Sequence, residues 1–297
     1  MTKNKTHAST VCLHLFFVLV CLCFLIPMLM VISISFSSEA WVNAGGYSLI
    51  PHEFSTAAYK LAFKNPKQML NAYGITFAES VIGTVSSCIV AGMAAYPLSR
   101  SNFRFKKPIT WLIFFTMLFN AGMIPNYITL AKYYHLNNSF WIYILPGITG
   151  GAWNTMVFRT FFKGLPESLF EAARIDGAKE LYIFFRIVIP LSTPVFASLG
   201  FMTLVGKWND YTTSMIYIRD ESLYTLQYLL QRILNESSFL KSLMSEGTVG
   251  VDVSQMDEPT ETLKYALCVI AAGPMLLVFP FFQKYFSQGL TIGAVKG

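Results

Sequence analysis

The sequence predicts an all-α membrane protein that crosses the bilayer several times. Of its 297 residues, 54% are hydrophobic and only 13% are charged, whereas an ordinary soluble domain carries about 25% charged residues. The mean hydropathy is +0.49, and the apolar residues form long runs close to the roughly 20 residues that a helix needs to cross a membrane. A membrane barrel would instead show alternating segments of about 10 residues. Because lipid offers the backbone no hydrogen-bond partner, we expect each run to be helical.

Uninterrupted apolar runs predict six transmembrane helices, near residues 11–35, 73–97, 109–131, 139–161, 185–206 and 263–286. The first run follows Lys3 and Lys5, as in a signal peptide. It is too long for a typical signal-peptide core and lacks a small-residue cleavage site, so we expect it to be retained.

Basic residues predict the orientation of these helices in a cell membrane. If the N-terminus lies inside, the inner segments hold 13 of the 22 basic residues, with the densest cluster between Arg100 and Lys107. Because Lys and Arg concentrate in short cytoplasmic loops, both termini should be cytoplasmic. The basic residues form no continuous face with interleaved aromatic residues, so nucleic acid is not an expected partner.

Two long segments should lie outside, namely residues 36–72 and 207–262. The second holds nine acidic and four basic residues. It could be a surface that faces a partner, but charge alone favours a solvated loop. The five cysteines lie in apolar runs without C-x-x-C spacing, so we expect small buried hydrophobic residues rather than a metal site.

Motifs for catalysis are absent from the sequence. There is no G-x-x-x-x-G-K-[ST] motif, because Gly206-Lys207 is followed by Trp208, and neither H-E-x-x-H nor G-x-S-x-G occurs. We therefore expect no catalytic residues and no cofactor bound by this chain. If the protein depends on ATP, another polypeptide must hydrolyse it.

The segment 164–190, between the fourth and fifth predicted spans, has the pattern of helix, turn and helix. Ser168 followed by Glu171 forms a capping-box pattern, and Pro166 suits a first helical turn. Gly177 can adopt the left-handed conformation that ends a helix.

The second helix of this segment should bend where it meets the membrane. Pro190 and Pro194 lie there, and each removes one helical hydrogen bond.

One face of the first helix should contact a partner. Leu169, Ala172 and Ala173 share a face by their spacing, and Glu171 and Asp176 could pair with basic residues of a partner's groove. The alternative is an ordinary amphipathic connector on the inner membrane surface, and periodicity alone favours that interpretation.

The same residues match a longer pattern: Glu171-Ala172-Ala173, three residues, Gly177, nine residues, Ile187, one residue, then Ile189-Pro190. This pattern resembles the permeases of ATP-binding-cassette (ABC) importers. In that family the segment is the coupling helix that docks into a cleft of the ATPase subunit. The resemblance implies a type I ABC importer permease fold, with Glu171 meeting a basic ATPase residue and Gly177 making the turn.

Two further stretches are similar to the carbohydrate-uptake branch of this family, in particular its maltose-type second permease. The C-terminal tail 287–297 ends in GLTIGAVKG. By resemblance the tail reaches between the two ATPase subunits, through Gly289, Leu290, Thr291, Lys296 and Gly297. The run from Lys207 to Tyr211 resembles the sequence beyond that branch's fifth span, and the outer loop that follows contacts the sugar-binding protein. The sequence also resembles the subset of this branch that handles complex oligosaccharides.

The resemblance implies an assembly. Its other members would be a second permease, two copies of an ATPase subunit that uses ATP and Mg, and an extracytoplasmic binding protein that delivers an oligosaccharide. One alternative is a permease for a non-sugar solute. Another is an ion-gradient transporter, which should show intramembrane ionisable residues and repeated halves. Glu79 is the one acid well inside a predicted span, and no repeat is visible.

The candidate substrate pathway follows from residue chemistry. Trp208 and Tyr211 could stack on sugar rings, while Asn209 and Asp210 could bind hydroxyl groups. Aromatic residues at a helix end are equally common as interface anchors. Glu79 could line the pathway, or could lie near the outer surface.

Overall fold

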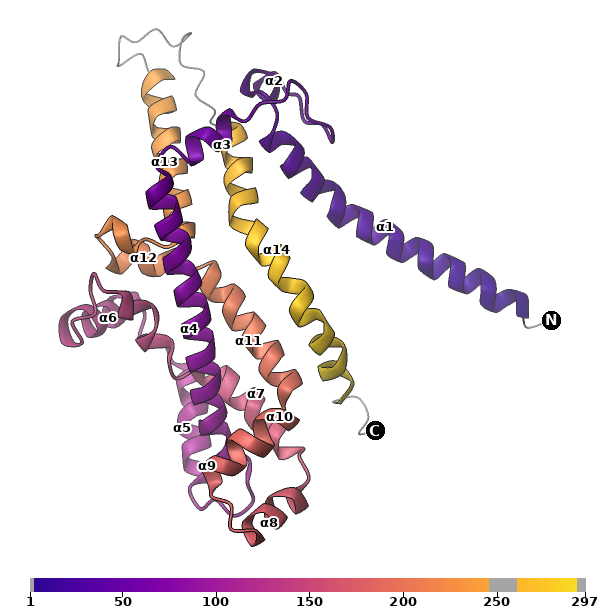
Figure 1. The fold of residues 1–297 in the computed structure, drawn as a ribbon, viewed down its shortest axis with the longest axis vertical. Helices are drawn as coiled ribbons and strands as arrows, with labels where there is room; N and C mark the ends of the chain where they lie inside the picture. Colours follow the sequence, from indigo (N-terminus) through magenta and orange to yellow (C-terminus); the bar gives the residue numbers. More distant parts are fainter. Residues whose placement is uncertain (1–2, 246–260, 293–297) are drawn as a thin grey trace. The chain divides into compact units, whose positions relative to one another are not determined.

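The computed structural model describes residues 3–245 and 261–292, and within them the secondary structure is helical, with no strand. Figure 1 shows these helices along the chain. They form two compact units. Unit 1 comprises Met1–Pro66 and Leu230–Pro274, and unit 2 comprises Lys67–Leu229 and Met275–Gly297.

Unit 1 contains a long apolar helix and a helix start that is capped from elsewhere in the chain. Its helices are α1 (Lys3–Ser35), α2 (Glu39–Asn43), α3 (Ala57–Ala62), most of α13 (Leu226–Ser245) and the first part of α14 (Glu261–Ile292). The Glu39 carboxylate accepts hydrogen bonds from the backbone N–H groups of Glu261 and Thr262, at 2.8 and 2.9 Å. This acid satisfies N–H groups that have no partner inside a helix, and its charge opposes the positive end of the α14 dipole.

Unit 2 is built around α4 (Pro66–Ser99). The other helices are α5 (Lys106–Leu118), α6 (Met123–Tyr127), α7 (Gly151–Lys163), α8 (Glu167–Ile175), α9 (Glu180–Ile183), α10 (Ile189–Leu191), α11 (Thr193–Trp208) and α12 (Thr212–Tyr217), with a π-helical turn at Phe184–Val188. Its core is largely aromatic, and four phenylalanines in it are almost completely buried: Phe158, Phe162, Phe170 and Phe184.

Three helices have the length and apolarity of a membrane span. They are α1, α4 and α14, which match the predicted spans near 11–35, 73–97 and 263–286. Two further spans are bent pairs. Lys106–Leu118 meets Met123–Tyr133 at 114°, and Glu180–Leu191 meets Thr193–Trp208 at 83°. The described part of the chain thus contains up to five spans by length and composition.

The prediction of one continuous helix over 139–161 is wrong. Residues Phe140–Tyr143 and Leu145–Gly147 form 3-10 turns, and a regular helix begins only at Gly151. Pro146 removes a helical hydrogen bond, and Gly150 and Gly151 take φ of 70° and 72°, which breaks the helix. The 13 residues of α7 rise about 20 Å, which is less than the roughly 30 Å of a hydrocarbon core.

The spans predicted at 109–131 and 185–206 also differ from straight helices. The first breaks where Gly122 takes φ of 86°, and the second breaks at Ser192, between Pro190 and Pro194. The second bend is the one that the prolines predict. The described part of 207–262 is not a solvated loop, because it contains α12 and the 20-residue α13.

Candidate functional site: the α8–α9 elbow and a buried polar seam

The start of α8 is set by Glu167 rather than by a capping box. The helix begins at Glu167, Pro166 is its N-cap, and no side chain caps it. The predicted pairing of Ser168 with Glu171 is therefore wrong. An acid in the first turn favours this helix start through the helix dipole. The Glu167 carboxylate is also held by Arg100.

The end of α8 is a Schellman turn, as Gly177 predicts. Gly177 takes φ of 79°, its N–H donates to the Arg174 carbonyl at 3.0 Å, and the Ala178 N–H donates to the Ala173 carbonyl at 2.9 Å. These are the two hydrogen bonds that define the motif. Ala173 and Ala178 both pack against the core of unit 2, so the turn is tied to the fold on its inner side.

The two faces of α8 differ. Phe170 is completely buried and Ala173 packs beside it, so Ala173 does not share the outer face with Leu169 and Ala172 as the spacing suggested. The outer face also carries Ile175, which is 85% exposed and was not among the candidates from the sequence. Exposed residues on this helix and its C-cap are Ser168, Leu169, Glu171, Ala172, Arg174, Ile175 and Asp176.

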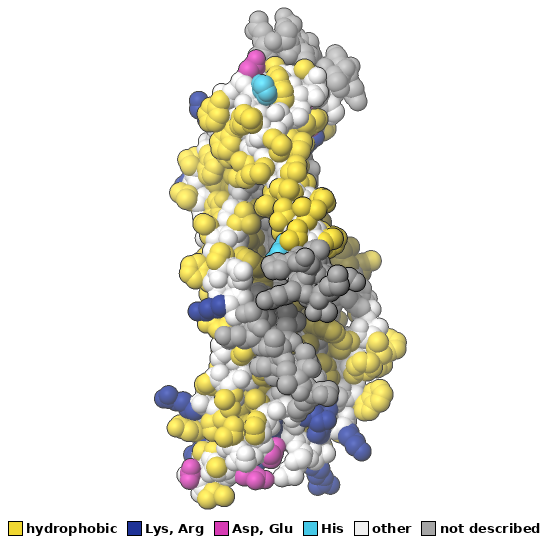
Figure 2. Space-filling view, turned by 90° about the vertical axis from the view of Figure 1, so that its right-hand side faces the viewer, with side chains coloured by type: hydrophobic (Ala, Val, Ile, Leu, Met, Phe, Trp, Pro, Cys, Tyr) yellow, Lys and Arg dark blue, Asp and Glu magenta, His cyan; other side chains and the backbone are white. Residues whose placement is uncertain are grey.

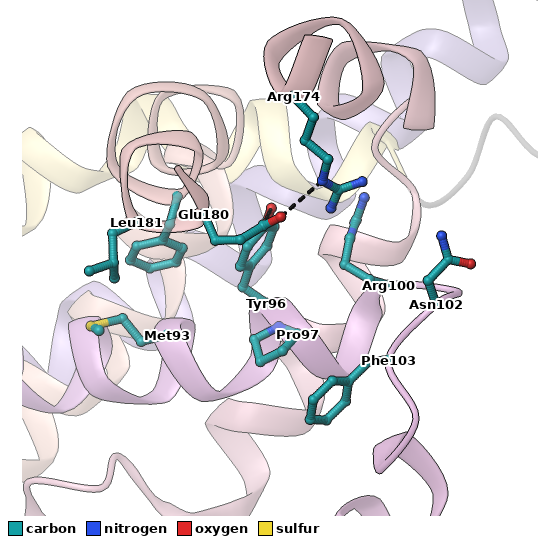
Figure 3. Close-up of a pocket in the computed structure, with 10 residues that line it drawn as sticks. Met93, Tyr96, Pro97, Arg100, Asn102, Phe103, Arg174, Glu180 and Leu181 are labelled. Atoms are coloured by element: carbon teal, nitrogen blue, oxygen red, sulfur yellow. Dashed lines mark hydrogen bonds and ion pairs between the residues drawn. The ribbon is translucent and has the colours of Figure 1, made fainter. Parts of the chain in front are cut away.

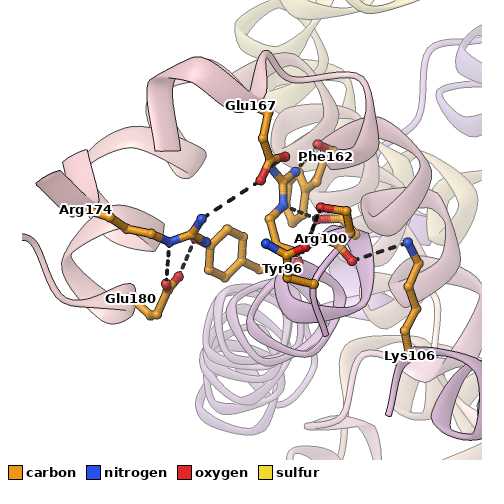
Figure 4. Close-up of polar contacts among 10 residues, drawn as sticks. Tyr96, Arg100, Lys106, Phe162, Glu167, Arg174 and Glu180 are labelled. Atoms are coloured by element: carbon orange, nitrogen blue, oxygen red, sulfur yellow. Dashed lines mark hydrogen bonds and ion pairs between the residues drawn. The ribbon is translucent and has the colours of Figure 1, made fainter. Parts of the chain in front are cut away.

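Arg100 holds the N-terminal end of α8 from the end of α4 (Figure 4). Its side chain is buried, and its Nε donates to Ser99 Oγ at 3.0 Å. One terminal nitrogen lies 3.1 Å from a Glu167 carboxylate oxygen, the other donates to the Phe162 carbonyl, and the guanidinium carbon lies 4.0 Å from the centre of the Phe170 ring. Burial lowers the pKa of Arg100, and the Glu167 carboxylate opposes that shift. We call this set of contacts the Arg100 clamp.

A second contact holds the C-terminal end of α8. Arg174 Nε donates to Glu180 at 2.9 Å, and the Tyr96 hydroxyl donates to the other Glu180 oxygen at 2.6 Å. The hydrogen bond to Glu180 raises the pKa of Arg174. Since Tyr96 belongs to α4 and Glu180 to α9, helices α4, α8 and α9 are joined at both ends of α8.

The residues of the Glu171 to Pro190 motif thus fall into two groups. Ala173, Gly177 and Ile187 belong to the packed interior or to the turn, and Pro190 lies at the 83° bend. Glu171, Ala172 and Asp176 are exposed. The first group builds a bent, rigid element, which leaves the second group available to a partner.

Charged side chains gather at the end of unit 2 that carries α8, whereas hydrophobic side chains cover much of the visible face above it (Figure 2). This end includes the basic loop after α4 and the acidic and basic residues of α8 and α9. A charged end next to an apolar band indicates the level at which unit 2 leaves the membrane.

A polar seam runs along the buried side of α4. Glu79 is 0% exposed, and neither of its carboxylate oxygens has a hydrogen-bond partner within the described parts of the chain. The hydroxyls of Ser80 and Thr84, on the same helix, are buried without a partner as well. The spacing of four residues places the last two on one face.

Lys207 of α11 completes this seam and was not a candidate from the sequence. Its side chain lies directly over Gly83, where a Cβ would overlap it, and its ammonium donates to the Tyr143 carbonyl at 2.8 Å. Glu79 and Lys207 are close enough to interact electrostatically. Their 128-residue separation in sequence gave no signal of this proximity. The complete burial of Glu79 also excludes its position at the protein's solvent-exposed surface.

The other pathway candidates have structural partners. Trp208 is buried, with its ring 6.4 Å from that of Tyr73. Asn209 Nδ2 donates to the Val205 carbonyl at 2.9 Å, and Asp210 accepts from the Thr213 N–H at 3.0 Å. Tyr211 is exposed.

The tail candidates lie at the end of the described chain. Gly289, Leu290 and Thr291 belong to the last turns of α14, and Lys296 and Gly297 lie outside the described residues. Among the described residues, no three His, Cys, Asp or Glu side chains are grouped so that they could hold a metal ion.

Comparisons with known proteins agree with this geometry. Residues 87–292 match the family model for the binding-protein-dependent transport system inner membrane component. A polygalacturonan/rhamnogalacturonan transport system permease protein of Bacillus subtilis (strain 168), YtcP, is 38% identical over 286 residues, which are 95% of each chain. The arabinooligosaccharides transport system permease protein AraQ of the same strain is 28% identical and covers 97% of this chain and 96% of its own.

A solved structure is similar over nearly the whole chain. It is the crystal structure of a bacterial ABC transporter involved in the import of the acidic polysaccharide alginate. The matched chain has a TM-score of 0.77 and 29% sequence identity, with 96% of this chain and 98% of that chain covered.

Proposed function

This chain belongs to the inner membrane components of binding-protein-dependent transport systems, and from that premise we propose that it forms half of the pathway through which an ABC importer brings oligosaccharides into a bacterial cell. The observation that carries the proposal is the α8–α9 elbow. It is held at both ends to α4 and presents Leu169, Glu171, Ala172 and Ile175 outward. An exposed, rigid helix of this kind suits a partner that must move the membrane helices.

The elbow is the coupling helix in this proposal. Closure of an ATPase subunit that grips α8 would displace α8 as a rigid body, and the Arg100 clamp and Glu180 would carry that displacement into α4 and α9. Opening and closing of the pathway would follow from this movement. Glu171, exposed on the gripped face, would meet a basic residue of the ATPase cleft.

The complete importer would contain partners of three kinds. We propose a second permease as the other half of the pathway, two copies of an ATPase subunit that use ATP and Mg, and an extracytoplasmic solute-binding protein. The tail 287–297 would reach between the ATPase subunits. With both termini in the cytoplasm the chain would cross the membrane an even number of times, and the 3-10 turns together with α7 would complete the sixth crossing. The charged end of unit 2 would be its cytoplasmic end.

The proposed cargo is an oligosaccharide, and acidic glycans are the favoured class. Two similar proteins are named for polygalacturonan and rhamnogalacturonan and for alginate. In this chain the cargo would pass the polar seam of Glu79 and Lys207 together with Tyr211. An intramembrane carboxylate is costly, which supports a functional reason for Glu79. The alternative cargo is a non-sugar solute, which the binding assay below would reveal.

The test of coupling is a Glu171→Lys variant in the complete transporter, reconstituted in vesicles with its binding protein. We expect ATP hydrolysis to continue while uptake falls at least tenfold, because like charges would then face each other in the cleft. The matched control is Ser101→Lys, which adds a positive charge at an exposed residue of the loop after α4, away from the outer face of α8. Normal uptake by Glu171→Lys would show that Glu171 is not the coupling contact.

The test of cargo is direct ligand binding by the cognate binding protein. Calorimetric titration with oligogalacturonates, alginate oligomers and neutral arabino-oligosaccharides should show binding of at least one glycan class. Binding of peptides or metal ions in place of every glycan would refute the carbohydrate assignment and leave the importer assignment in place.

A further inference from the structure

A cavity of about 400 Å³ lies beside the elbow, where α4 ends (Figure 3). Its two ends differ in chemistry. Met93 and Leu181 lie toward one end, and Arg100, Asn102 and Arg174 lie toward the other together with Phe103. Phe184 also lines the cavity. A volume in this range is typical of a ligand site, and the division into two ends suits an amphiphile.

The polar end can bind an anion. Arg100, Arg174 and Glu180 line it. Arg100 is buried, and its nitrogens are engaged by Ser99, Glu167 and the Phe162 carbonyl. Arg174 is therefore the guanidinium that a ligand in the cavity can use. Arg174 Nε donates to Glu180, but its terminal nitrogen lies 3.9 Å from Glu167, beyond hydrogen-bond distance. Since a guanidinium carries five N–H donors, Arg174 retains donors for a further acceptor. Phosphate matches this fork geometry with two parallel hydrogen bonds.

The apolar end is open to a hydrocarbon chain. Leu181 is 61% exposed at its edge, and Met93 is partly exposed on α4. Phe105, exposed on the loop that follows α4, adds apolar surface nearby in sequence to the basic residues Arg104, Lys106 and Lys107. Basic pockets between membrane helices on the cytoplasmic side are suited to acidic lipid headgroups.

We propose that this cavity binds an anionic phospholipid of the inner leaflet, with its phosphate on the remaining N–H groups of Arg174 and an acyl chain along Met93 and Leu181. The lipid would bridge α4 and α9 next to the Arg100 clamp. It would then stiffen the same joint that carries movement from α8 to α4. The proposal depends on the membrane orientation of unit 2 and not on the identity of the cargo.

The experiment uses the whole transporter, purified in detergent and equilibrated with equal amounts of phosphatidylglycerol and phosphatidylcholine. Native mass spectrometry then counts the lipids that stay bound. We expect phosphatidylglycerol to be retained over phosphatidylcholine by about tenfold or more. Both lipids offer a phosphate, but the choline ammonium would be repelled by Arg174 and by the basic loop after α4, whereas glycerol carries no positive charge. Excess inorganic phosphate should not displace it, because a free anion lacks the acyl chain; displacement would identify a simple anion site and overturn the lipid assignment.

Two variants test the position of the lipid. Arg174→Gln removes a phosphate ligand and Met93→Trp fills the apolar end, and each should abolish the preference for phosphatidylglycerol. The control is Met202→Trp, an exposed methionine of α11, which should bind lipid as the unchanged protein does. In vesicles, the unchanged transporter should also take up cargo faster with phosphatidylglycerol than with phosphatidylcholine alone, a readout that requires no substitution.

Three results would overturn the proposal. Equal retention of the two lipids would show that the cavity does not select for charge. Retention of phosphatidylglycerol by Met93→Trp would place the lipid elsewhere. Loss of the ATPase subunit from Met93→Trp, with lipid retention unchanged, would identify the cavity as a protein contact. If the cargo assay above failed, the lipid-retention results could still be interpreted, because lipid retention needs no transported sugar.

Discussion

The Arg100 clamp makes a prediction whose size can be worked out from its contacts. In Arg100→Gln, the side chain loses its positive charge and cannot keep all of the contacts of the guanidinium. The main ones besides Ser99 are the Glu167 carboxylate, the Phe162 carbonyl and the Phe170 ring. Because the docking face of α8 points the other way, the ATPase should still bind. The defect should appear in the connection between α8 and α4.

The three lost contacts contribute unequally to the loss of stability. The Phe162 carbonyl is left without its donor in a buried place, which costs about 1 to 3 kcal/mol. The desolvated contact with the Phe170 ring contributes about 1 to 2 kcal/mol. The ion pair adds only about 0.5 to 1 kcal/mol, since the Glu167 side chain is 42% exposed. A loss of about 2.5 to 6 kcal/mol in the free energy of local opening follows if these contributions add.

Hydrogen exchange of the reconstituted transporter measures this quantity directly, because exchange of protected amides reports local opening. At 1.4 kcal/mol per factor of ten, protection over residues 167–175 should fall by roughly a hundredfold or more, down to whatever protection unfolded α8 retains. Sugar uptake per ATP hydrolysed should fall with it. Arg100→Lys should lie between the two proteins, because an ammonium can reach Glu167 but cannot form the fork.

The control for this experiment is Arg104→Gln. Arg104 is exposed in the same basic loop, with its guanidinium 5.9 Å from the Phe105 ring, so its replacement should change stability by less than about 0.5 kcal/mol. If Arg100→Gln kept normal protection of α8 and normal uptake, or if Arg104→Gln did equal damage, the clamp would have no special role and charge alone would explain the loop.

Three further predictions concern the turn and the seam. Gly177→Ala should cost about 1 to 2 kcal/mol from the left-handed backbone alone, because a Cβ there meets nothing within 4 Å; thermal unfolding of the transporter should show it, with Gly177→Asn less affected. Gly150→Ala should destabilise the protein more, by about 2 to 5 kcal/mol, since its Cβ would lie 2.5 Å from the Ser87 carbonyl oxygen. The yield of folded protein measures this loss, and a yield equal to that of the Gly177→Ala variant would contradict the prediction. Glu79→Gln should lower uptake at least tenfold. The double variant Glu79→Gln with Lys207→Gln should recover part of the loss, because it leaves no unbalanced charge. Equal uptake by the unchanged protein, the single variant and the double variant would show that the seam is not part of the pathway.

Long helices were predictable from this sequence because membrane burial leaves a strong compositional signal. The apolar runs of α1, α4 and α14 extend beyond a span length and contain few charges. Glycine and proline positions also predicted local turns and bends of the backbone. Gly177 adopts the left-handed turn, and the prolines around Ser192 accompany the bend.

Apolarity does not say where a helix breaks, and this explains the failure over 139–161. The run is hydrophobic throughout, yet glycine and proline decide its path. Contacts between distant residues are invisible for a different reason. The sequence identifies Arg100 only as one of the basic residues of the loop after α4. Its pairing with Glu167 depends on how α4 and α8 meet in three dimensions. The same holds for Glu79 and Lys207.

The division of the coupling motif into interior and exposed residues has a mechanical consequence. A docking helix transmits force only if it cannot tilt independently of the helices behind it. Here α8 is held to α4 at one end by Arg100 and to α9 at the other by Arg174, while Tyr96 of α4 joins Glu180 of α9. With both ends fixed, tilting α8 alone must break a charged contact at one of them, so a push on its outer face moves α4 and α9 together. In the coupling role proposed above, the partner would push at Glu171, and the six-residue spacing from Glu171 to Gly177 would set how far from the turn that push acts.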